Sequence, residues 1–347
     1  MSCVILLGAG ASKGTLGEQA PIAKDFGQYL NNNITEWSEN YPYLAAAIRF
    51  LEERIPDTSE KAWALDKVWS AIDNRVKLQY IWGNLSLPGA PFPPPTNKNI
   101  YKIGLDPWGL AGFELRCAIA RVYGKDLDLN IQKATEGNGT VKKKIEQLQQ
   151  GDCVISFNYD LLAERILEKL KKKVTIANPY TVQVNDTILL CKPHGSLSWQ
   201  GYFPENGRCV QIFNDPITEE KNDFDFELNT DIHVAVVAPV PFKSEIIDSA
   251  LQLNRVPNFF RLLVAQWQYA IQRISEAEKL IVLGYGFPPE DLHAHFLFAE
   301  ASATRKSNRK LEIEVYESCE QRFEDVKKEI DIIFRSMTCK YQGMVIP

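Results

Sequence analysis

The first twelve residues, Met1 to Ser12, read MSCVILLGAGAS and guide the interpretation of the whole chain. Val4 to Leu7 is a short apolar run with the length of a buried strand, and glycines follow at positions 8 and 10. A strand that runs directly into Gly-x-Gly is typical of the first βα unit of a nucleotide-binding fold. Glycine lets the backbone approach a phosphate, and the next helix offers N–H groups to it. We therefore expect phosphate binding at Gly8, Ala9, Gly10, Ala11 and Ser12.

The composition is that of an ordinary globular protein. The chain has 347 residues, 45% of them hydrophobic and 24% charged, with a net charge of -5. No overall positive field attracts it to nucleic acid, so we expect no nucleic-acid partner. No apolar stretch approaches the ~18 residues of a membrane helix, and the N-terminal apolar run ends at Gly8 without a charged region before it, unlike a signal peptide. These features predict a cytoplasmic protein without a membrane partner.

The seven cysteines are scattered, and no two of them form C-x-x-C. An odd number of dispersed cysteines is typical of a reducing compartment. It also argues against a structural zinc site, which requires close cysteine pairs. We expect Cys191, which lies in an apolar run, to be a core residue.

The chain changes character near residue 150. Residues 13–20 predict a mobile loop, and Pro21 suits the first turn of a helix that runs to about residue 31. Residues 32–150 then contain few strand candidates. Their helical patterns fall at 43–53, 60–74, 109–123 and 140–149, around a proline-rich loop at 87–96. This segment predicts an inserted helical module.

After residue 150, short strand candidates alternate with amphipathic helical patterns. The strand candidates are 153–157, 174–177, 187–191, 233–239, 279–283 and 311–316, and the helical patterns are 161–172, 259–277, 291–301 and 320–334. This alternation predicts an α/β fold, a Rossmann-like and mostly parallel sheet with helices on both faces. We expect residues 1–31 to form its first βα unit, 32–150 the inserted helical module and 151–347 the remainder.

In such a sheet, ligands bind beyond the carboxyl ends of the strands, where the strand order reverses. Five segments follow predicted strands and are rich in glycine, proline and polar residues. They are 8–12, 158–160, 194–196, 239–243 and 284–291. Their convergence at one edge of the sheet predicts a binding site.

Two of these segments hold the candidates for catalysis. Asn158 follows the strand CVISF, where a short amide can hold a ribose hydroxyl or a water. His194 follows another strand in KPHGS, and histidine titrates near neutrality, which suits a general base or a partner for a ribose hydroxyl. Asp160 either caps the next helix or contacts a ligand, and both interpretations stay open. Gly195 would let a ligand approach His194.

The last segment contains a second glycine-rich strand end, Gly284-Tyr285-Gly286, which could hold a ribose or phosphate opposite the first. Asp291 caps the next helix or touches a ligand. His293 and His295 lie two residues apart, point to different faces of a helix and are not expected to share a metal.

The glycine pattern departs from that of a dehydrogenase. The third glycine of G-x-G-x-x-G would fall at position 13, which is lysine, and no acidic residue ends a second strand about 20 residues on. The sequence also lacks G-x-S-x-G, H-E-x-x-H and G-x-x-x-x-G-K-[ST]. A different kind of nucleotide site is therefore expected.

The strand ends, taken in order, resemble those of the sirtuin superfamily. GAGAS at 8–12 is similar to the sirtuin GAG-x-S turn, SFNYD at 156–160 to its asparagine and aspartate motif, and KPHGS at 192–196 to its catalytic His-Gly. LGYGFPPED at 283–291 and VVAPVPFKS at 236–244 resemble a bacterial sirtuin-like branch. The resemblance extends over nearly the whole chain.

Two departures identify the branch. Deacylating sirtuins carry a zinc ribbon of two cysteine pairs after the catalytic histidine, whereas only Cys209 lies between His194 and the strand candidate at 233. The loop after GAGAS reads APIAKDF at 20–26, without the sirtuin acidic-aromatic-arginine run. The chain thus resembles the branch without a zinc ribbon, known chiefly for NAD+ hydrolysis in bacterial anti-phage defence.

This resemblance implies an NAD+ glycohydrolase that takes NAD+ as substrate and needs no metal. It would deplete NAD+ when a partner protein signals infection, as part of a homo- or hetero-oligomer. Asn158 would orient water or the ribose diol, and His194 would accept a proton. Asp160 and Asp291 would support them, and Gly284 with Tyr285 would line the adenosine side.

Two alternatives stay open. The first is an NAD+-dependent protein deacylase that uses the same site. The second is a non-catalytic subunit that binds NAD+ or ADP-ribose and regulates a partner.

Overall fold

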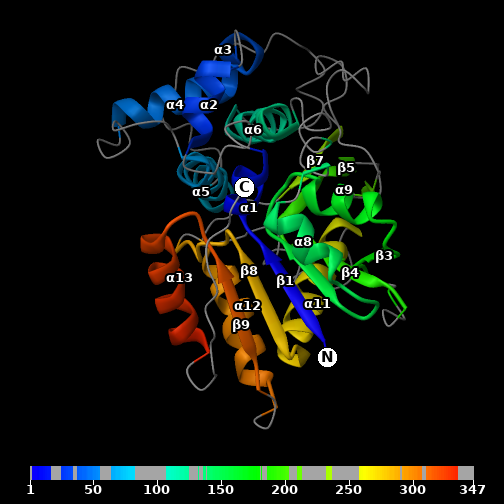
Figure 1. Ribbon diagram of the computed structural model, residues 1–347. Coiled ribbons are helices and arrows are strands. Elements are labelled where there is room, and N and C mark those ends of the chain that lie inside the picture. Colours follow the sequence, from blue (N-terminus) through cyan, green and yellow to red (C-terminus); the bar gives the residue numbers. More distant parts are fainter. Residues whose placement is uncertain are drawn as a thin grey trace. The chain divides into compact units, whose positions relative to one another are not determined.

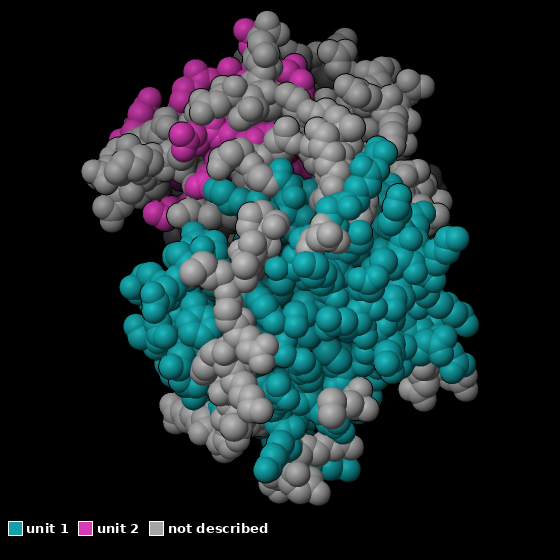
Figure 2. Space-filling model, viewed as in Figure 1, with its two compact units in different colours: residues 1–20, 126–196, 241–347 teal, residues 21–125, 197–240 magenta. Residues whose placement is uncertain are grey.

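The computed structural model divides the chain into two compact units (Figure 1, Figure 2). Unit 1 comprises residues 1–20, 126–196 and 241–347, and unit 2 comprises residues 21–125 and 197–240. The residues that the structure describes are 2–16, 25–33, 37–54, 64–82, 107–124, 132, 136–137, 139–179, 181, 186–202, 209–212, 232–236, 258–289, 291–306 and 310–334. Within these ranges, no helix is long and apolar enough to cross a membrane.

Unit 1 is built on a parallel sheet. In the described part of the chain, its strands are β1 (Cys3–Leu7), β2 (Cys153–Ser156), β3 (Val174–Ile176), β4 (Ile188–Cys191), β8 (Lys279–Leu283) and β9 (Glu312–Tyr316). They lie in the order β3-β4-β2-β1-β8-β9, and every neighbouring pair is parallel. The chain adds β2, β4 and β3 on one side of β1 and β8 and β9 on the other. The strand order therefore reverses at β1, directly before the glycine-rich turn.

Helices cover both faces of this sheet. In Figure 1, α11 (Asn258–Glu276) and α12 (Leu292–Thr304) lie on one side, and α8 (Thr140–Glu146) and α9 (Leu162–Lys169) lie on the other. Alternate strand residues, such as Val4 and Leu6, join the core formed with α11, α12 and α13 (Glu320–Ile333). The intervening Ile5 and Leu7 are equally buried. Burial on both faces explains why these strands read as continuous apolar runs.

Unit 2 is mainly helical. Its helices are α2 (Phe26–Asn33), α3 (Trp37–Asn40), α4 (Pro42–Arg54), α5 (Leu65–Trp82) and α6 (Pro107–Gly124). The central helix α6 contacts α2, α4 and α5, and Trp69 and Trp108 are buried among them. A second sheet in the described residues has the order β6-β5-β7, from β5 (Gly195–Tyr202), β6 (Cys209–Ile212) and β7 (Ile232–Val236).

The predicted α/β class with a mostly parallel sheet is confirmed, and the structure differs from the local predictions in three places. Residues 13–16 belong to helix α1 (Ala9–Leu16) and not to a loop. The strand predicted at 233–239 forms β7 in the small sheet, outside the parallel one. Strands β5 and β6 were missed. The alternation of serine with Leu197 and Trp199 was the signal for β5, because period-two patterning indicates a strand.

The compact units differ from the segments expected from the sequence. Helix α8 lies in unit 1, and residues 197–240 group with the helices of unit 2. The division at residues 32 and 150 stays a prediction about domain organisation. The predicted loop at 87–96 and the strand end at 239–243 lie outside the described residues.

Candidate functional site

The glycines after β1 and β8 pack directly against each other. A Cβ atom on Gly8 would lie 2.4 Å from the Tyr285 Cα, and one on Gly284 would lie 2.2 Å from the Ala11 backbone nitrogen. Gly284 also has a φ of +59°, in the left-handed region that glycine adopts most readily. These glycines therefore let the two loops at the reversal point come into backbone contact.

This contact uses amides that the sequence had assigned to a phosphate. The N–H of Gly8 donates to the Leu283 carbonyl at 3.0 Å, and that of Gly10 donates to the Gly284 carbonyl at 2.9 Å. The N–H of Ala11 donates to the Gly8 carbonyl at 2.9 Å. A phosphate at this turn would thus need donors other than these three amides. Phosphate binding at residues 8–12, including Ala9, stays a prediction.

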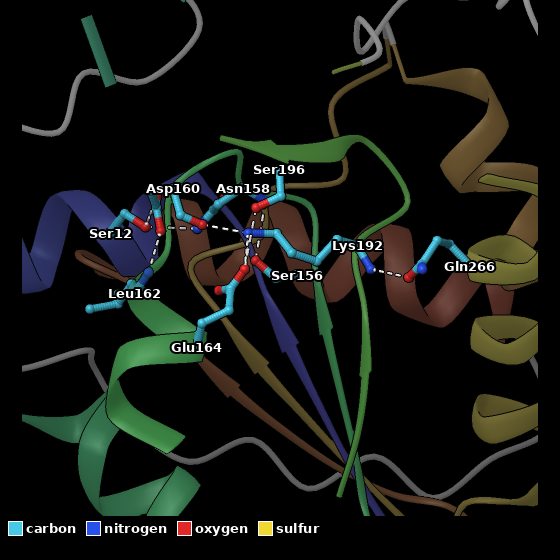
Figure 3. A network of polar contacts seen from close by, with 9 residues as sticks. All are labelled: Ser12, Ser156, Asn158, Asp160, Leu162, Glu164, Lys192, Ser196 and Gln266. Atoms are coloured by element: carbon cyan, nitrogen blue, oxygen red, sulfur yellow. Dashed lines mark hydrogen bonds and ion pairs between the residues drawn. The ribbon is translucent and has the colours of Figure 1, made fainter. Parts of the chain in front are cut away.

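Asn158, Ser12 and Asp160 form a buried hydrogen-bonded cluster between β1 and β2 (Figure 3). The Asn158 Nδ2 donates to the Gly8 carbonyl and to the Ser12 Oγ, both at 2.8 Å. The Ser12 Oγ donates to the Asp160 Oδ2 at 2.6 Å. The described residues offer no hydrogen bond to the Asn158 Oδ1. The amide therefore keeps an acceptor that a ligand hydroxyl or a water can use.

Asp160 binds the start of the next helix, which is one of the two roles that the sequence left open for it. Its Oδ1 accepts the backbone N–H of Leu162 at 3.0 Å, at the start of α9, while its Oδ2 accepts the Ser12 hydroxyl. It therefore orders the first turn of α9 and holds Ser12 against Asn158. Its contact with a ligand stays a prediction.

His194 and Asp291 form a buried pair. The His194 Nε2 lies 2.9 Å from the Asp291 Oδ2, and the two residues are 3% and 0% exposed. The Tyr285 hydroxyl lies 3.4 Å from the same carboxylate oxygen, and the pKa of Tyr285 is raised by burial and by Asp291. Asp291 is the N-cap residue of α12, but its side chain makes no capping bond. A carboxylate that orients an imidazole is the arrangement of a supported general base.

Phe157 connects these two clusters. Its ring stacks on Tyr285 with centroids 4.7 Å apart and meets His194 edge-on at 5.0 Å. Phe157 is buried and directly precedes Asn158. The aromatic contacts therefore fix the imidazole beside the loop that carries the asparagine.

The backbone before His194 is held by two neighbouring residues of α11. Gln266 and Trp267 of α11 bind it: the Lys192 N–H donates to the Gln266 Oε1 at 2.6 Å, and the Trp267 Nε1 donates to the Pro193 carbonyl at 3.1 Å. Gly195 follows His194 as the first residue of β5. The histidine turn is thus anchored to a helix on one face of the sheet.

Two buried charged residues at this edge were not predicted from the sequence. Lys192 is 1% exposed, and its Nζ lies 2.8 Å from the Glu164 Oε1. Glu317, directly after β9, is 3% exposed, and its Oε1 has no hydrogen-bond partner among the described residues. The signal for Glu317 was an acidic residue that ends the strand following Gly284-Tyr285-Gly286, since acidic residues at such strand ends bind ribose.

Other predicted features are placed outside this network. The His295 Nε2 lies 3.2 Å from the carbonyls of Phe287 and Pro288, and the His293 ring packs near Trp267. Cys191 is buried, as predicted for a core residue, and burial raises the pKa of its thiol. No group of side chains that could hold a metal occurs in the part of the chain that the structure describes.

No protein family model and no curated protein matches the sequence. Solved structures of Sir2 proteins are similar to it at low identity. A Sir2–p53 peptide–NAD+ complex is 15% identical, with 99% of this chain and 89% of that chain covered and a TM-score of 0.35. Sir2 with the inhibitor EX-527, 2'-O-acetyl-ADP-ribose and deacetylated p53 peptide is 14% identical, with 98% and 87% covered and a TM-score of 0.33. The fold assignment rests on the strand order and pairing given above.

Proposed function

We propose that this chain is an NAD+ glycohydrolase, which cleaves NAD+ with water to nicotinamide and ADP-ribose. The observation that carries the proposal is the buried His194–Asp291 pair at the carboxyl edge of a parallel sheet, in a loop next to that of Asn158. The edge lies where the strand order reverses, which is where α/β sheets bind nucleotides. The resemblance of the strand-end motifs to the sirtuin-like branch supplies the reaction.

Cleavage of the nicotinamide–ribose bond passes through an oxocarbenium-like state. The electron pair of the broken bond goes to nicotinamide, and a water oxygen bonds to the ribose carbon and loses a proton. His194 would take that proton on Nδ1, because its Nε2 faces Asp291. Asp291 would stabilise the imidazolium that forms.

Asn158 would orient the water or the ribose hydroxyls through Oδ1, since its Nδ2 is committed to Gly8 and Ser12. Directly after β9, Glu317 would accept a hydrogen bond from the adenosine ribose. A buried carboxylate oxygen without a partner is costly, and a ligand hydroxyl would satisfy it. Gly284 and Tyr285 would line the adenosine side of the site.

The test is to measure nicotinamide release from NAD+ by the purified protein, alone and with candidate partner proteins. We expect His194→Ala and Asn158→Ala each to lower turnover on the order of 10²-fold or more, because each removes a group that acts in the transition state. Asn178→Ala is a matched control, since Asn178 also follows a strand but lies at the edge strand β3. Unchanged turnover in both site variants would refute these roles.

The wider role that we propose is an anti-phage effector gated by a partner or a ligand, and it rests on the motif resemblance alone. A deacylase is the second candidate, because the same histidine and asparagine would serve it. NAD+ consumption that requires an acyl-lysine peptide would favour that candidate. Tight ADP-ribose binding without turnover under any condition would favour a regulatory subunit.

A further inference from the structure

Lys192 is a buried lysine that joins two loops of the candidate site (Figure 3). It directly follows β4, and its Nζ donates to the backbone carbonyl of Asp160, beyond the end of β2. The same Nζ pairs with the Glu164 Oε1 at 2.8 Å, in the first turn of α9. A charge this deeply buried is costly unless it is paired, so its partners define its position.

The lysine is linked to both candidate catalytic side chains. Through the chain, it is two residues from His194. Through hydrogen bonds, it holds Asp160, whose carboxylate accepts the Ser12 hydroxyl, and that same hydroxyl accepts from the Asn158 Nδ2. The bonds from Lys192 through Asp160 and Ser12 therefore end at the asparagine.

The backbone and the side chain of Lys192 are bound by different partners. Its backbone N–H is bound to Gln266, whose own Nε2 donates to the Ala177 carbonyl at the end of β3. Its side chain is bound on the opposite side, to the start of α9. Ser196, two residues after His194, also donates to the Glu164 Oε1 at 3.3 Å. Both sides of the histidine turn thus reach the same carboxylate.

We propose that Lys192 is a positioning residue that holds the Asn158 loop and the His194 turn in one fixed arrangement through Asp160 and Glu164. The proposal rests on the proposed function, because it assigns the lysine to the same site. Lys192 touches no reacting atom and acts through the residues that do. A displacement of about 1 Å between catalytic groups is enough to lower a rate on the order of 10²-fold.

A purely structural ion pair would behave differently, and a double variant separates the two roles. Replacing a buried ion pair with apolar residues of similar volume often preserves stability. Lys192→Met with Glu164→Met therefore removes the tether without leaving a buried charge unpaired. Ser196→Ala is the matched control, because it removes a contact to Glu164 and leaves Lys192 bound to Asp160.

The first measurement is the NMR signal of the Asn158 side-chain amide, in protein labelled with 15N-asparagine and assigned with Asn158→Ala. This amide lies several bonds of the network away from Lys192. We expect its signal to shift in the double variant and to stay in place in Ser196→Ala. An unmoved signal in a folded double variant would overturn the proposal. Lys192→Gln, which is shorter and uncharged, replaces the double variant if that protein does not fold, with the same expected shift.

The second measurement is NAD+ turnover. We expect kcat of the double variant to fall about 10- to 100-fold while its melting temperature stays close to that of the wild type. A double variant with both the kcat and the melting temperature of the wild type would overturn the positioning role. If the wild-type protein does not cleave NAD+ under any condition, with or without candidate partner proteins, the proposed function fails, and the Asn158 signal still decides whether Lys192 holds that loop.

Discussion

Two glutamates, one within β9 and one directly after it, differ in how their buried carboxylates are paired. Glu314 and Glu317 are three residues apart at β9 and are 4% and 3% exposed. Glu314 lies 2.9 Å from the Lys144 Nζ and 2.6 Å from the Lys279 Nζ. Glu317 has a carboxylate oxygen without a partner among the described residues. The glutamate within the strand is paired with two lysines, and the glutamate beyond its carboxyl end is incompletely paired.

The pKa values of the two glutamates shift in opposite directions. Burial alone would raise the pKa of Glu314, but hydrogen bonds and charges from Lys279 and Lys144 outweigh it and lower the pKa. Burial raises the pKa of Glu317, and Arg322 and the Ser318 amide offset it only in part. A buried carboxyl group that is left incompletely paired makes Glu317 a candidate for ligand binding.

The two ends of the sheet also hold different features. At the amino end, Asp152 accepts the N–H groups of Cys3 at 2.8 Å and Gln149 at 2.7 Å. At the carboxyl end lie the glycine contacts and the His194–Asp291 pair. We infer that the amino end stabilises the fold and that the carboxyl end holds the site, and the following variants test that division.

The largest effect is expected for Gly284→Ala. The added Cβ would lie 2.2 Å from the Ala11 nitrogen, at a φ of +59°. Strain and overpacking together should cost about 3 kcal/mol or more of unfolding free energy, measured by chemical denaturation. Gly286→Ala is the control, because nothing lies within 4 Å of its added Cβ. Equal losses in both variants would show that the close approach of the two loops is unimportant.

Asp291→Asn should leave the fold intact and impair catalysis. The variant keeps the size of the side chain but removes the charge that faces His194 at 2.9 Å. We expect kcat for NAD+ to fall on the order of 10²-fold or more, because the imidazolium loses its stabilising partner. Asp325→Asn, on an exposed ion pair of α13, serves as the control. A variant with wild-type kcat would exclude the histidine pair from the mechanism.

Glu314→Gln should lower stability and leave catalysis intact, the converse of Asp291→Asn. It leaves Lys144 and Lys279 without their shared carboxylate, and we expect a loss of about 1–3 kcal/mol in unfolding free energy with unchanged turnover. Because the folded-state pKa of Glu314 is lowered, its contribution is present above the ordinary value of 4.5 and is lost as the pH falls through the folded-state pKa. The stability difference from the wild type should therefore shrink below about pH 4.5. A difference that persists in acid would contradict the ion-pair explanation.

The sequence predicted the parallel sheet and the glycine-rich, polar segments at its carboxyl edge, since apolar runs and the glycines after them are local signals. It also selected His194, Asn158 and Asp291, because polar residues directly after strands meet at one edge. It could not predict that Gly8 and Gly284 pack against each other's loops, since that contact joins segments far apart in the chain. Lys192 was missed for a similar reason, because its partners lie on another strand end and helix.

The smallest effect on stability is expected for Glu317→Gln, and it is a gain where Gly284→Ala and Glu314→Gln cause a loss. The raised pKa of Glu317 means that the folded state holds a proton that the unfolded chain releases above its ordinary value of 4.5. Stability from this group is therefore present at lower pH and is lost as the pH rises. The uncharged amide removes this loss, so the variant should be about 1 kcal/mol more stable than the wild type at pH 7 to 8 and equally stable in acid.

The same variant should bind ADP-ribose more weakly in calorimetric titration, because the proposed ribose acceptor has lost its charge. Glu314→Gln, three residues away, should bind ADP-ribose like the wild type. A gain in stability together with a loss in affinity would mean that this end of the sheet sacrifices stability for binding. If Glu317→Gln instead lowers stability at neutral pH, its carboxylate is paired in the folded protein, and the contrast between Glu314 and Glu317 does not hold.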